Sequence, residues 1–312
     1  MFVREFVDGQ SVEQALLVRG REVRSRADGG TVFELKLGDR TGTVAAMLRE
    51  NCERLTEVCT QGCVVWVSGH FDGTRLELHF LRAARDEERD MRALLDGPPR
   101  SAAQMEADLR ELVSTVQNGH LRALLDRLLG PASPTWPQFR DAPAAKRYHQ
   151  AYQHGLLEHA LSVAQAVSAI SATFPGIDRD VAVTGALLHD IGKLEAYTSD
   201  PCAIDLTDLG KLQGEIPLGY YRVRRLIEEL PGFPEPLAAA VLHIILAHHG
   251  ALEHGSPVLP ATREATLVHM IDNLGGRLGS FDRLEKELPQ GAAWSGFDRA
   301  LGGGAYFAER AA

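Results

Sequence analysis

The sequence predicts a multidomain chain in which a small N-terminal β-barrel is followed by an all-α region. Residues 12 to about 85 form partly alternating runs rich in Val, Leu and Phe, which is typical of half-buried strands. After Arg89 this pattern stops, and apolar residues return at the three- and four-residue spacing of helices. The chain has 312 residues, 45% of them hydrophobic, which is enough to build two cores.

Three strand-like runs make up the N-terminal part: ALLVRGREVRS, TVFELKLGDRTGTVAAML and CVVWVSGHFDGTRLELHFLRAA. Asp72-Gly73 marks a hairpin in the third run. Between the second and third runs we expect one helix over LRENCERLTEV, residues 48–58. Strands, a helix and a closing hairpin favour a small barrel of the OB-fold type, with a small β-sandwich as the alternative.

A linker at Gly97-Pro98-Pro99 separates this part from predicted helices at MEADLRELVSTVQ and LRALLDRLLG. Three prolines then interrupt the chain, at Pro131, Pro134 and Pro137. We therefore expect an OB-fold-like, nucleic-acid-binding domain over residues 1–97, a helical linker segment over 98–140 and a helical domain over 141–312.

Composition restricts the cellular setting. No apolar signal-peptide segment follows the N-terminus, and the longest uncharged runs contain polar residues, so no membrane span is expected. The four cysteines include no CxxC pair, which suits the reducing cytoplasm. The net charge of −9 argues mildly against a nucleic-acid partner, although four arginines lie close together near the N-terminus: Arg19, Arg21, Arg24 and Arg26.

The stretch ALLHDIGKLEAY, residues 186–197, contains a histidine and an aspartate in an apolar setting. From Val181 to Ile191, Asp190 is the one charged residue. A carboxylate inside an apolar core is costly, so it is normally paired, hydrogen-bonded or bound to a metal. Adjacent helical positions point about 100° apart, so His189 and Asp190 cannot both face one site by simple projection. An aspartate that bridges two metals, with His189 serving one of them, would explain the doublet.

Other predicted helices also carry ionisable residues on apolar faces. His159 lies in HGLLEHALSVAQAVSAI, His248 and His249 end PLAAAVLHIILAHHG, and Asp272 lies in REATLVHMIDNLGG. Each residue alone is more often a hydrogen-bonded core group or a helix end. Together, imidazoles and carboxylates on facing helices form a ligand set for divalent transition metals such as Mn, Fe, Co or Zn.

These residues resemble the H…HD…D signature of the HD-domain metal-dependent phosphohydrolases. The flanking words are similar to those of the YhaM-type 3′→5′ exoribonuclease family, which joins an N-terminal OB-fold to a C-terminal HD domain. The resemblance covers roughly residues 140–280 in motifs and the N-terminal part in architecture alone. The words are AAKRYHQAYQHGLLEHALSV, LLHDIGK, IDLTDLGKLQGEIPLG, HIILAHHGALEHGSPVLP and LVHMIDNLGGR.

The resemblance implies the following roles. One metal would be held by His159, His189, Asp190 and Asp272, and a second by His248 and His249 with Asp190 as the bridge. Catalysis would use Asp190 and also Lys193, which matches the lysine of HDxGK and would contact a phosphate oxygen. His149 and Arg277 are candidates for substrate contact by their position, or plain surface residues.

Glu215 departs from the family pattern, which has a histidine there. A carboxylate adds a hard oxygen donor, so we expect a divalent cation, most readily Mn, in one or two sites, with Fe, Co, Ni or Zn as alternatives. The substitution could equally weaken the second site, or Glu215 could be an acid at a helix start.

The resemblance implies a metal-dependent 3′→5′ exonuclease that hydrolyses phosphodiester bonds of single-stranded RNA, and of single-stranded DNA, through metal-activated water. Two alternatives are a nucleotide phosphohydrolase or cyclic-dinucleotide phosphodiesterase of HD type, and an RNA-binding regulator with a decayed site. The chain could also form a homo-oligomer.

In the nuclease interpretation the β domain captures the strand. Exposed aromatic rings would stack on bases and arginines would follow the phosphates. The alternative is that most of these rings belong to the core. The stacking candidates are Phe33, Trp66, Phe71 and Phe80, and the phosphate candidates are Arg19, Arg21 and Arg24.

Overall fold

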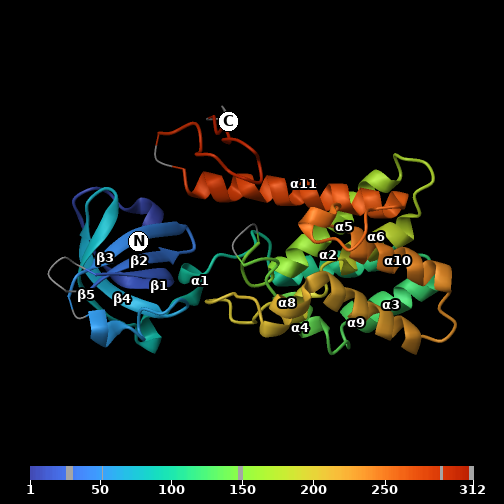
Figure 1. The fold of residues 1–312 in the computed structure, drawn as a ribbon, viewed down its shortest axis with the longest axis horizontal. Coiled ribbons are helices and arrows are strands. Elements are labelled where there is room, and N and C mark those ends of the chain that lie inside the picture. The colour runs from blue at the N-terminus through green and yellow to red at the C-terminus, as the bar shows by residue number, and fades with distance from the viewer. Residues whose placement is uncertain (26–30, 51, 147–149, 289–290, 309–312) are drawn as a thin grey trace. The chain divides into compact units, whose positions relative to one another are not determined.

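The computed structural model describes residues 1–25, 31–50, 52–146, 150–288 and 291–308. The chain forms two compact units (Figure 1). The first contains Met1–Asp96, Asp200–Ala203 and Lys286–Ala292, and the second contains Gly97–Ser199, Ile204–Glu285 and Ala293–Ala312. Strands fill the first unit and helices the second, so the predicted β-then-α class is confirmed.

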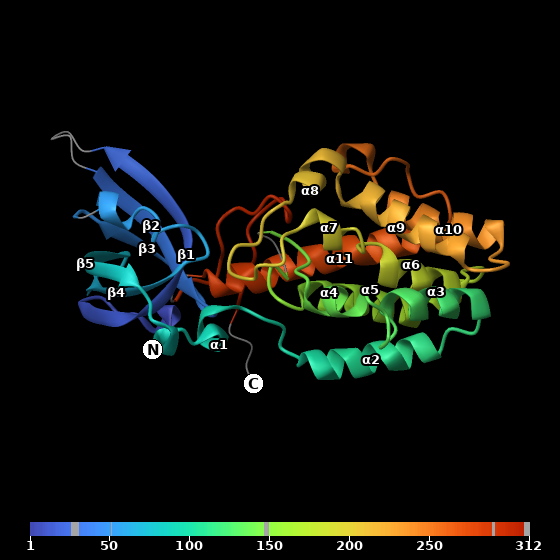
Figure 2. The same ribbon diagram turned by 90° about the horizontal axis from the view of Figure 1, so that it is seen from below.

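Five strands of the first unit close into a barrel in the order β1-β2-β3-β5-β4 (Figure 2). β3 and β5 run parallel, whereas the other neighbouring pairs are antiparallel. The register of β1 against β2 shifts between Val18 and Gly20, which bends the long β1 so that it pairs with β2 and β4. The strands are β1 (Gln10–Ser25), β2 (Thr31–Asp39), β3 (Gly42–Leu48), β4 (Val64–Phe71) and β5 (Arg75–Ala83).

Alternating side chains fill the barrel. Val65 and Val67 on β4 are fully buried and pack with Leu16, Leu37 and Leu76 from three other strands. Trp66, which lies between them on β4, is less buried, as expected for a strand with one face toward a core. Short helical turns, η1 (Val3–Glu5), η3 (Asp86–Glu88) and α1 (Met91–Leu94), complete this unit.

The prediction of a single helix over residues 48–58 is wrong. Leu48 pairs with Phe33 in β2 and with Leu78 in β5, so the sheet takes up the start of that stretch. A short 3-10 turn, η2 (Cys52–Leu55), follows, and turns lead to β4. Cys52 is buried and its thiol donates to the carbonyl oxygen of Leu48 at 3.3 Å. Burial of this small side chain in the barrel core outweighs the helical pattern.

The second unit is built from helices that share one hydrophobic core. Met105, Leu124 and Phe139, from the segment we expected to be a linker, are buried in the same core as Leu156 and Leu187. Pro236 lies in the first turn of its helix, as the sequence indicates. The helices are α2 (Ala102–Ser114), α3 (Gly119–Leu129), α4 (Trp136–Asp141), α5 (Gly155–Ser171), α6 (Arg179–Leu188), α7 (Lys193–Ala196), α8 (Asp208–Gln213), α9 (Glu215–Glu229), α10 (Glu235–Ala247), η4 (Leu252–His254) and α11 (Arg263–Lys286).

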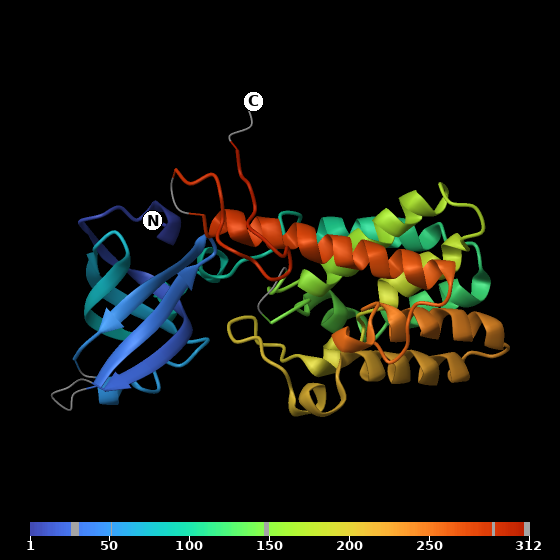
Figure 3. The ribbon, with the colours of Figure 1, turned by 45° about the horizontal axis from the view of Figure 1, so that its top comes forward.

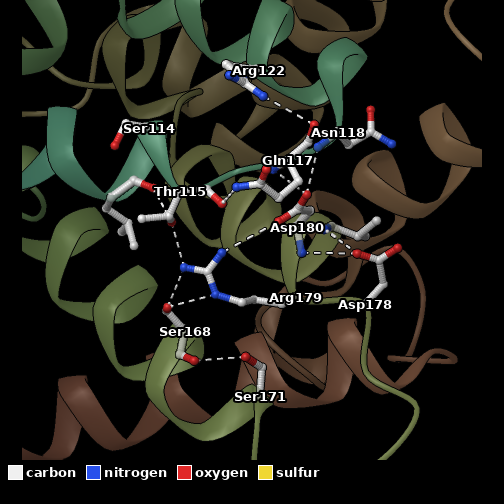
Figure 4. Close-up of polar contacts among 12 residues, drawn as sticks. Ser114, Thr115, Gln117, Asn118, Arg122, Ser168, Ser171, Asp178, Arg179 and Asp180 are labelled. Carbon is white, nitrogen blue, oxygen red and sulfur yellow. Dashed lines mark hydrogen bonds and ion pairs between the residues drawn. The ribbon is translucent and has the colours of Figure 1, made fainter.

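A polar network fastens the start of α6 to its neighbours (Figure 4). Asp178 caps the helix by accepting from the backbone N–H groups of Asp180 and Val181 at 3.0 and 3.1 Å. The Asp180 carboxylate accepts from the N–H of Gln117 at 2.7 Å, in the turn between α2 and α3. Arg179 donates to the hydroxyl of Ser168 on α5 at 2.8 Å. Because α6 is held at its start and the helix is rigid, these contacts also fix the position of its other end, at Leu188.

The longest helix, α11, runs along one side of the helical unit (Figures 1 and 3). Ala265, Val268 and Ile271 are buried on its inner face. α11 therefore closes one side of the helical core.

None of the helices in the described ranges combines the length and apolarity required to traverse a bilayer.

Candidate metal centre

The chain leaves α6 at the histidine–aspartate doublet. The helix ends at Leu188, and two tight turns follow: the N–H of Ile191 donates to the carbonyl of Leu188 at 3.1 Å, and that of Lys193 to Asp190 at 3.0 Å. His189 Nε2 lies 3.4 Å from Asp190 Oδ2, and both side chains are buried. His189 keeps helical backbone angles (φ −55°, ψ −37°), so adjacent positions still diverge by about 100°, but the two side chains are long enough for their tips to converge on one place.

A first cluster joins three helices around His189. His159 from α5 lies with its Nε2 3.2 Å from His189 Nε2 and 3.0 Å from Oδ1 of Asp272, on α11. One ligand atom from each of these three residues lies within 4.8 Å of the others. Oδ2 of Asp190 is 3.3 Å from His159 Nε2, so it belongs to the same group.

A second cluster lies beside the first. Ligand atoms of Glu215, His248 and His249 are within 4.8 Å of one another, and His249 Nε2 is 3.3 Å from Glu215 Oε1. His248 Nε2 lies 3.5 Å from Oδ1 of Asp190. The Asp190 carboxylate thus turns one oxygen toward each cluster, in the place that a bridging ligand would take.

Two glycines allow the elements that carry these clusters to approach. A Cβ on Gly185 would lie 2.3 Å from the Ile244 side chain, so glycine permits the close crossing of α6 and α10. A Cβ on Gly192 would lie 2.0 Å from the carbonyl oxygen of Glu215. Since that oxygen is backbone and cannot move aside, Gly192 is required to bring the start of α9 against the doublet.

The four imidazoles are oriented in the same way. Nδ1 of His189, His248 and His249 lies 2.7, 2.8 and 2.8 Å from backbone carbonyl oxygens, and Nδ1 of His159 lies 3.1 Å from Gln150 Oε1. Because an oxygen acceptor requires a proton on Nδ1, each Nε2 points toward the clusters and carries a lone pair whenever the ring is neutral. Metal-binding histidines are typically held in this way.

Gln150 was missed by the sequence analysis. It lies in the loop before α5 with φ 58, outside any helical repeat, so no spacing connects it to His159. Its amide oxygen nevertheless fixes the His159 tautomer. The stretch YHQAYQHG, which contains Gln150, is the one sequence signal that could have indicated it.

Two buried atoms test whether the residues fit a cation. Among the described residues, neither Asp190 Oδ1 nor His248 Nε2 has a hydrogen-bond partner. A bare imidazole lone pair 3.5 Å from a carboxylate oxygen is repulsive and costly when buried. A divalent cation held by both atoms removes that cost, and nitrogen with carboxylate oxygen is a donor set that Mn, Fe, Co, Ni or Zn accept. Asp190 and His248 therefore fit a divalent transition metal as ligands.

The electrostatics of the first cluster favour positive charge. Burial opposes protonation of His159, but Asp190 and Asp272 outweigh it and raise the His159 pKa to about 9. Burial also opposes ionisation of Asp190 and Asp272. Lys193, His189 and His159 nevertheless hold the Asp190 pKa below its usual range, and His159 and His189 do the same for the Asp272 pKa. In the metal-free cluster His159 thus holds a proton, and a metal ion must displace that proton in order to bind.

The second cluster contains one imidazole with a lowered pKa, that of His248, and one with a raised pKa, that of His249. Burial is the main cause that lowers the His248 pKa, so this ring stays neutral. The His249 pKa is raised because Glu215 outweighs the effect of burial. Burial opposes ionisation of Glu215, but Lys193 and His249 keep its pKa below the usual range. Glu215 is therefore an ionised carboxylate beside two imidazoles.

Lys193 lies against the bridge between the clusters. Its Nζ is 2.7 Å from Asp190 Oδ2, and the side chain is largely buried. Burial lowers the Lys193 pKa, but Asp190 and Glu215 outweigh it and raise the pKa above its ordinary value. The ammonium group thus remains charged at the edge of the site.

The two other substrate candidates are not placed in the clusters. His149 lies outside the described residues. Arg277 is exposed on α11, five residues after Asp272. At about 100° per residue it projects about 140° around the helix from Asp272. Its predicted role in substrate contact therefore receives no support from its position.

The predicted barrel aromatics divide into buried and exposed rings. Phe33 is 2% exposed in the barrel core, which argues against the stacking role we expected. Phe71 packs on the core with its ring 5.8 Å from that of Phe6. Trp66 is half-buried with the Arg82 guanidinium 5.4 Å from its ring centre, whereas Phe80 is half-exposed. Trp66 and Phe80 remain as candidates.

The predicted phosphate-binding arginines are mostly committed to the barrel itself. Arg19 donates to the Leu94 carbonyl at 3.2 Å, and burial lowers its pKa. Arg21 donates to the Thr56 carbonyl and lies over Phe33. Arg24 is exposed but pairs with Glu34 at 2.9 Å. Arg19 and Arg21 are thus engaged by backbone carbonyl oxygens and Arg24 by a carboxylate.

Comparison with known proteins identifies relatives. Residues 156–276 match the model of the HD domain. The chain is similar to the 3'-5' exoribonuclease YhaM of Bacillus subtilis (strain 168), with 29% identity over 90% of both chains. It is 29% identical to the YhaM of Geobacillus sp. (strain WCH70), over 90% of this chain and 87% of the relative. It is 28% identical to that of Bacillus pumilus (strain SAFR-032), over 91% of this chain and 90% of the relative.

Proposed function

Because the chain belongs to the YhaM-type family of HD-domain exoribonucleases, we propose that it is a metal-dependent 3′→5′ exonuclease acting on single-stranded RNA. Single-stranded DNA is proposed as a second substrate, since hydrolysis of its phosphodiester bond uses the same metal chemistry. The observation that carries the proposal is the Asp190 carboxylate, which lies between two clusters of potential metal ligands.

The residues of the two clusters would hold the metal. His159, His189 and Asp272 face one position, and Glu215, His248 and His249 face the other. Bound divalent cations supply water activation and charge neutralisation for phosphodiester hydrolysis. Asp190 offers one oxygen to each position, and the hydrogen bonds at Nδ1 keep each imidazole in the ligand tautomer.

Lys193 is proposed as the phosphate-binding residue. Its charged Nζ lies at the edge of the clusters, 2.7 Å from Asp190 Oδ2. A phosphate oxygen that enters the site can accept from the same ammonium group, which has three N–H donors. Lys193 would thus orient the scissile phosphate and balance negative charge next to Asp190.

Manganese is proposed as the preferred metal. The carboxylate of Glu215 adds a hard oxygen donor to the second cluster, and Mn²⁺ accepts oxygen ligands more readily than softer ions do. With three ionised carboxylates around the two positions, the donor set is richer in oxygen than a site with histidine in place of Glu215.

The barrel is proposed to capture the RNA strand through the outer surface of β4 and β5. Trp66 lies opposite Arg82, and Phe80 lies opposite Ser68, in the pairing of these two strands. A half-exposed ring and a ring beneath a guanidinium provide stacking surfaces for bases.

The cytoplasm is proposed as the location, and the four described cysteines, all free, support it.

A labelled-substrate experiment tests the function. The full chain with Mn²⁺ should shorten a 5′-labelled single-stranded RNA stepwise into a ladder, while a 3′-labelled RNA should release labelled mononucleotide at once. An RNA whose 3′ end is in a blunt duplex serves as the control and should be cut slowly. Release of 5′-label as mononucleotide before any shortened ladder, or cutting inside a circular RNA, would contradict the proposed polarity.

A further inference from the structure

A stripe of exposed apolar side chains follows the outer face of α11. Met270, Leu274, Leu278 and Phe281 recur at four-, four- and three-residue intervals, which places them on one side of the helix. They are 59%, 50%, 56% and 37% exposed. Asp272 lies on the opposite, inner side, so the stripe faces away from the metal centre.

The C-terminal segment packs an aromatic ring, that of Phe307, against the end of this stripe. It folds back along α11 (Figure 3), and the Phe307 ring lies 6.2 Å from that of Phe281. Next to Phe307, Tyr306 forms a ring pair with Trp294 at 4.9 Å, and both rings are more than half-exposed. An ion pair between Arg283 and Asp298 holds the segment to the helix. The α11 apolar face consists of Met270, Leu274, Leu278 and Phe281.

We propose that the α11 apolar face binds the same face of a second copy of this chain, forming a two-fold homodimer. Monomeric proteins rarely expose several large apolar side chains side by side. At roughly 150–200 Å² for each large apolar side chain, four residues that are about half-exposed offer roughly 300–400 Å² per copy. A standard interface buries about 800 Å² per partner, and a polar rim supplies the difference.

A second copy fits this face better than a nucleic acid does. On α11 itself, exposed Arg277 is accompanied by exposed Asp282 and Glu285, so the helix carries no excess of positive charge beside the face. Nucleic acid binding needs a positive surface for the phosphates. The aliphatic side chains of Met270, Leu274 and Leu278 offer no ring for a base to stack on. A self-complementary apolar helix face, in contrast, needs no partner charge.

Sedimentation of the full chain tests the homodimer. At micromolar concentration the unchanged protein should sediment as two chains. The double variant Leu274→Asp, Leu278→Asp should sediment as one chain, with its dissociation constant raised more than about 100-fold and its helical circular dichroism unchanged. Leu212→Asp is the matched control, because Leu212 is 83% exposed on α8 and outside the face.

Three results would overturn the homodimer: a single chain for the unchanged protein up to about 100 μM, a double variant that stays dimeric, or an equal loss of dimer in the Leu212→Asp control. Titration of the unchanged and double-variant proteins with a single-stranded RNA identifies the other occupant. If the unchanged protein is monomeric and the double variant binds RNA more weakly, the face binds nucleic acid. Sedimentation needs no nuclease activity, so the homodimer and the proposed function fail independently.

Discussion

The helical unit and the barrel place their polar and aromatic residues under opposite constraints. In the helical unit His189, Asp190 and His248 are buried among apolar helices. Each is a potential metal ligand because the others lie beside it. In the barrel, the aromatic and basic residues that suggested RNA binding mostly support the fold itself, as Phe33 and Arg19 do. A buried ionisable group costs free energy and so indicates a purpose, whereas a ring or arginine near a surface costs little.

The largest expected effect breaks the site on which this comparison depends. Asp190→Asn keeps the size of the side chain but removes the charge shared by both clusters, so hydrolysis should fall on the order of 10³-fold or more. Metal content per chain, measured by mass spectrometry after gel filtration, should fall in parallel. Asp208→Asn, at an almost fully exposed carboxylate on α8, is the control and should change neither quantity. Normal metal content in the Asp190→Asn protein would refute the bridge.

A pair of barrel variants sharpens the other side of the comparison. Phe33→Ala should lower the free energy of unfolding by about 3–5 kcal/mol, because it empties a site in the barrel core. Phe80→Ala should change it by less than about 0.5 kcal/mol but weaken binding to a long single-stranded RNA about tenfold. Denaturant unfolding and fluorescence anisotropy measure the two effects. Equal RNA affinity in the Phe80→Ala and unchanged proteins would remove stacking from the proposed capture role.

Loss of the Gln150 amide should weaken metal binding without loss of the fold. Gln150→Leu removes the acceptor at His159 Nδ1, and loss of such a partner typically costs about 10–100-fold in metal affinity. Competition with a fluorescent chelator measures the Mn²⁺ affinity. Gln138→Leu, on α4, is the matched control and should leave the affinity unchanged. An unchanged affinity in Gln150→Leu would mean that the loop is not part of the metal centre.

The pH dependence of stability should differ between the metal-free and the metal-loaded protein. In the metal-free protein the folded-state pKa of His159 is raised to about 9, above the unfolded value of about 6.5. The stabilisation is therefore complete below about pH 6.5 and lost as pH rises through about 9. Metal needs the deprotonated ligand, so metal adds stability over the same window. Melting temperatures with chelator should fall by a few degrees across that window, and the increment due to Mn²⁺ should grow. An increment that is flat with pH would contradict proton–metal competition.

The smallest expected effect concerns Glu215. Glu215→His replaces a hard oxygen donor with nitrogen, so the ratio of activity with Mn²⁺ to activity with Ni²⁺ should fall several-fold. Total activity with the best metal should change less than in Asp190→Asn, because Asp190 and His248 still face the second position. An unchanged metal ratio would mean that Glu215 is an acid at the start of α9 that does not contact metal.

The sequence predicted the parts of the fold that follow regular patterns. Strand alternation predicted the barrel, and the placement of His159 and Asp272 on apolar faces predicted that they would meet. The helix over 48–58 was wrong because pairing of Leu48 in the sheet is a tertiary effect that local pattern does not contain. Gln150 was missed because its loop has no period, and its contact to His159 exists only in three dimensions.

Anomalous diffraction at the manganese edge, from crystals of the full chain grown with Mn²⁺, tests the central claim most directly. The arrangement of the two clusters predicts two peaks, one beside His159, His189 and Asp272 and one beside Glu215, His248 and His249. The peaks should lie about 3.5–4 Å apart, as in other two-metal sites, with one Asp190 oxygen bound to each. A single peak, or two peaks of which either fails to contact Asp190, would contradict the bridging role of that carboxylate.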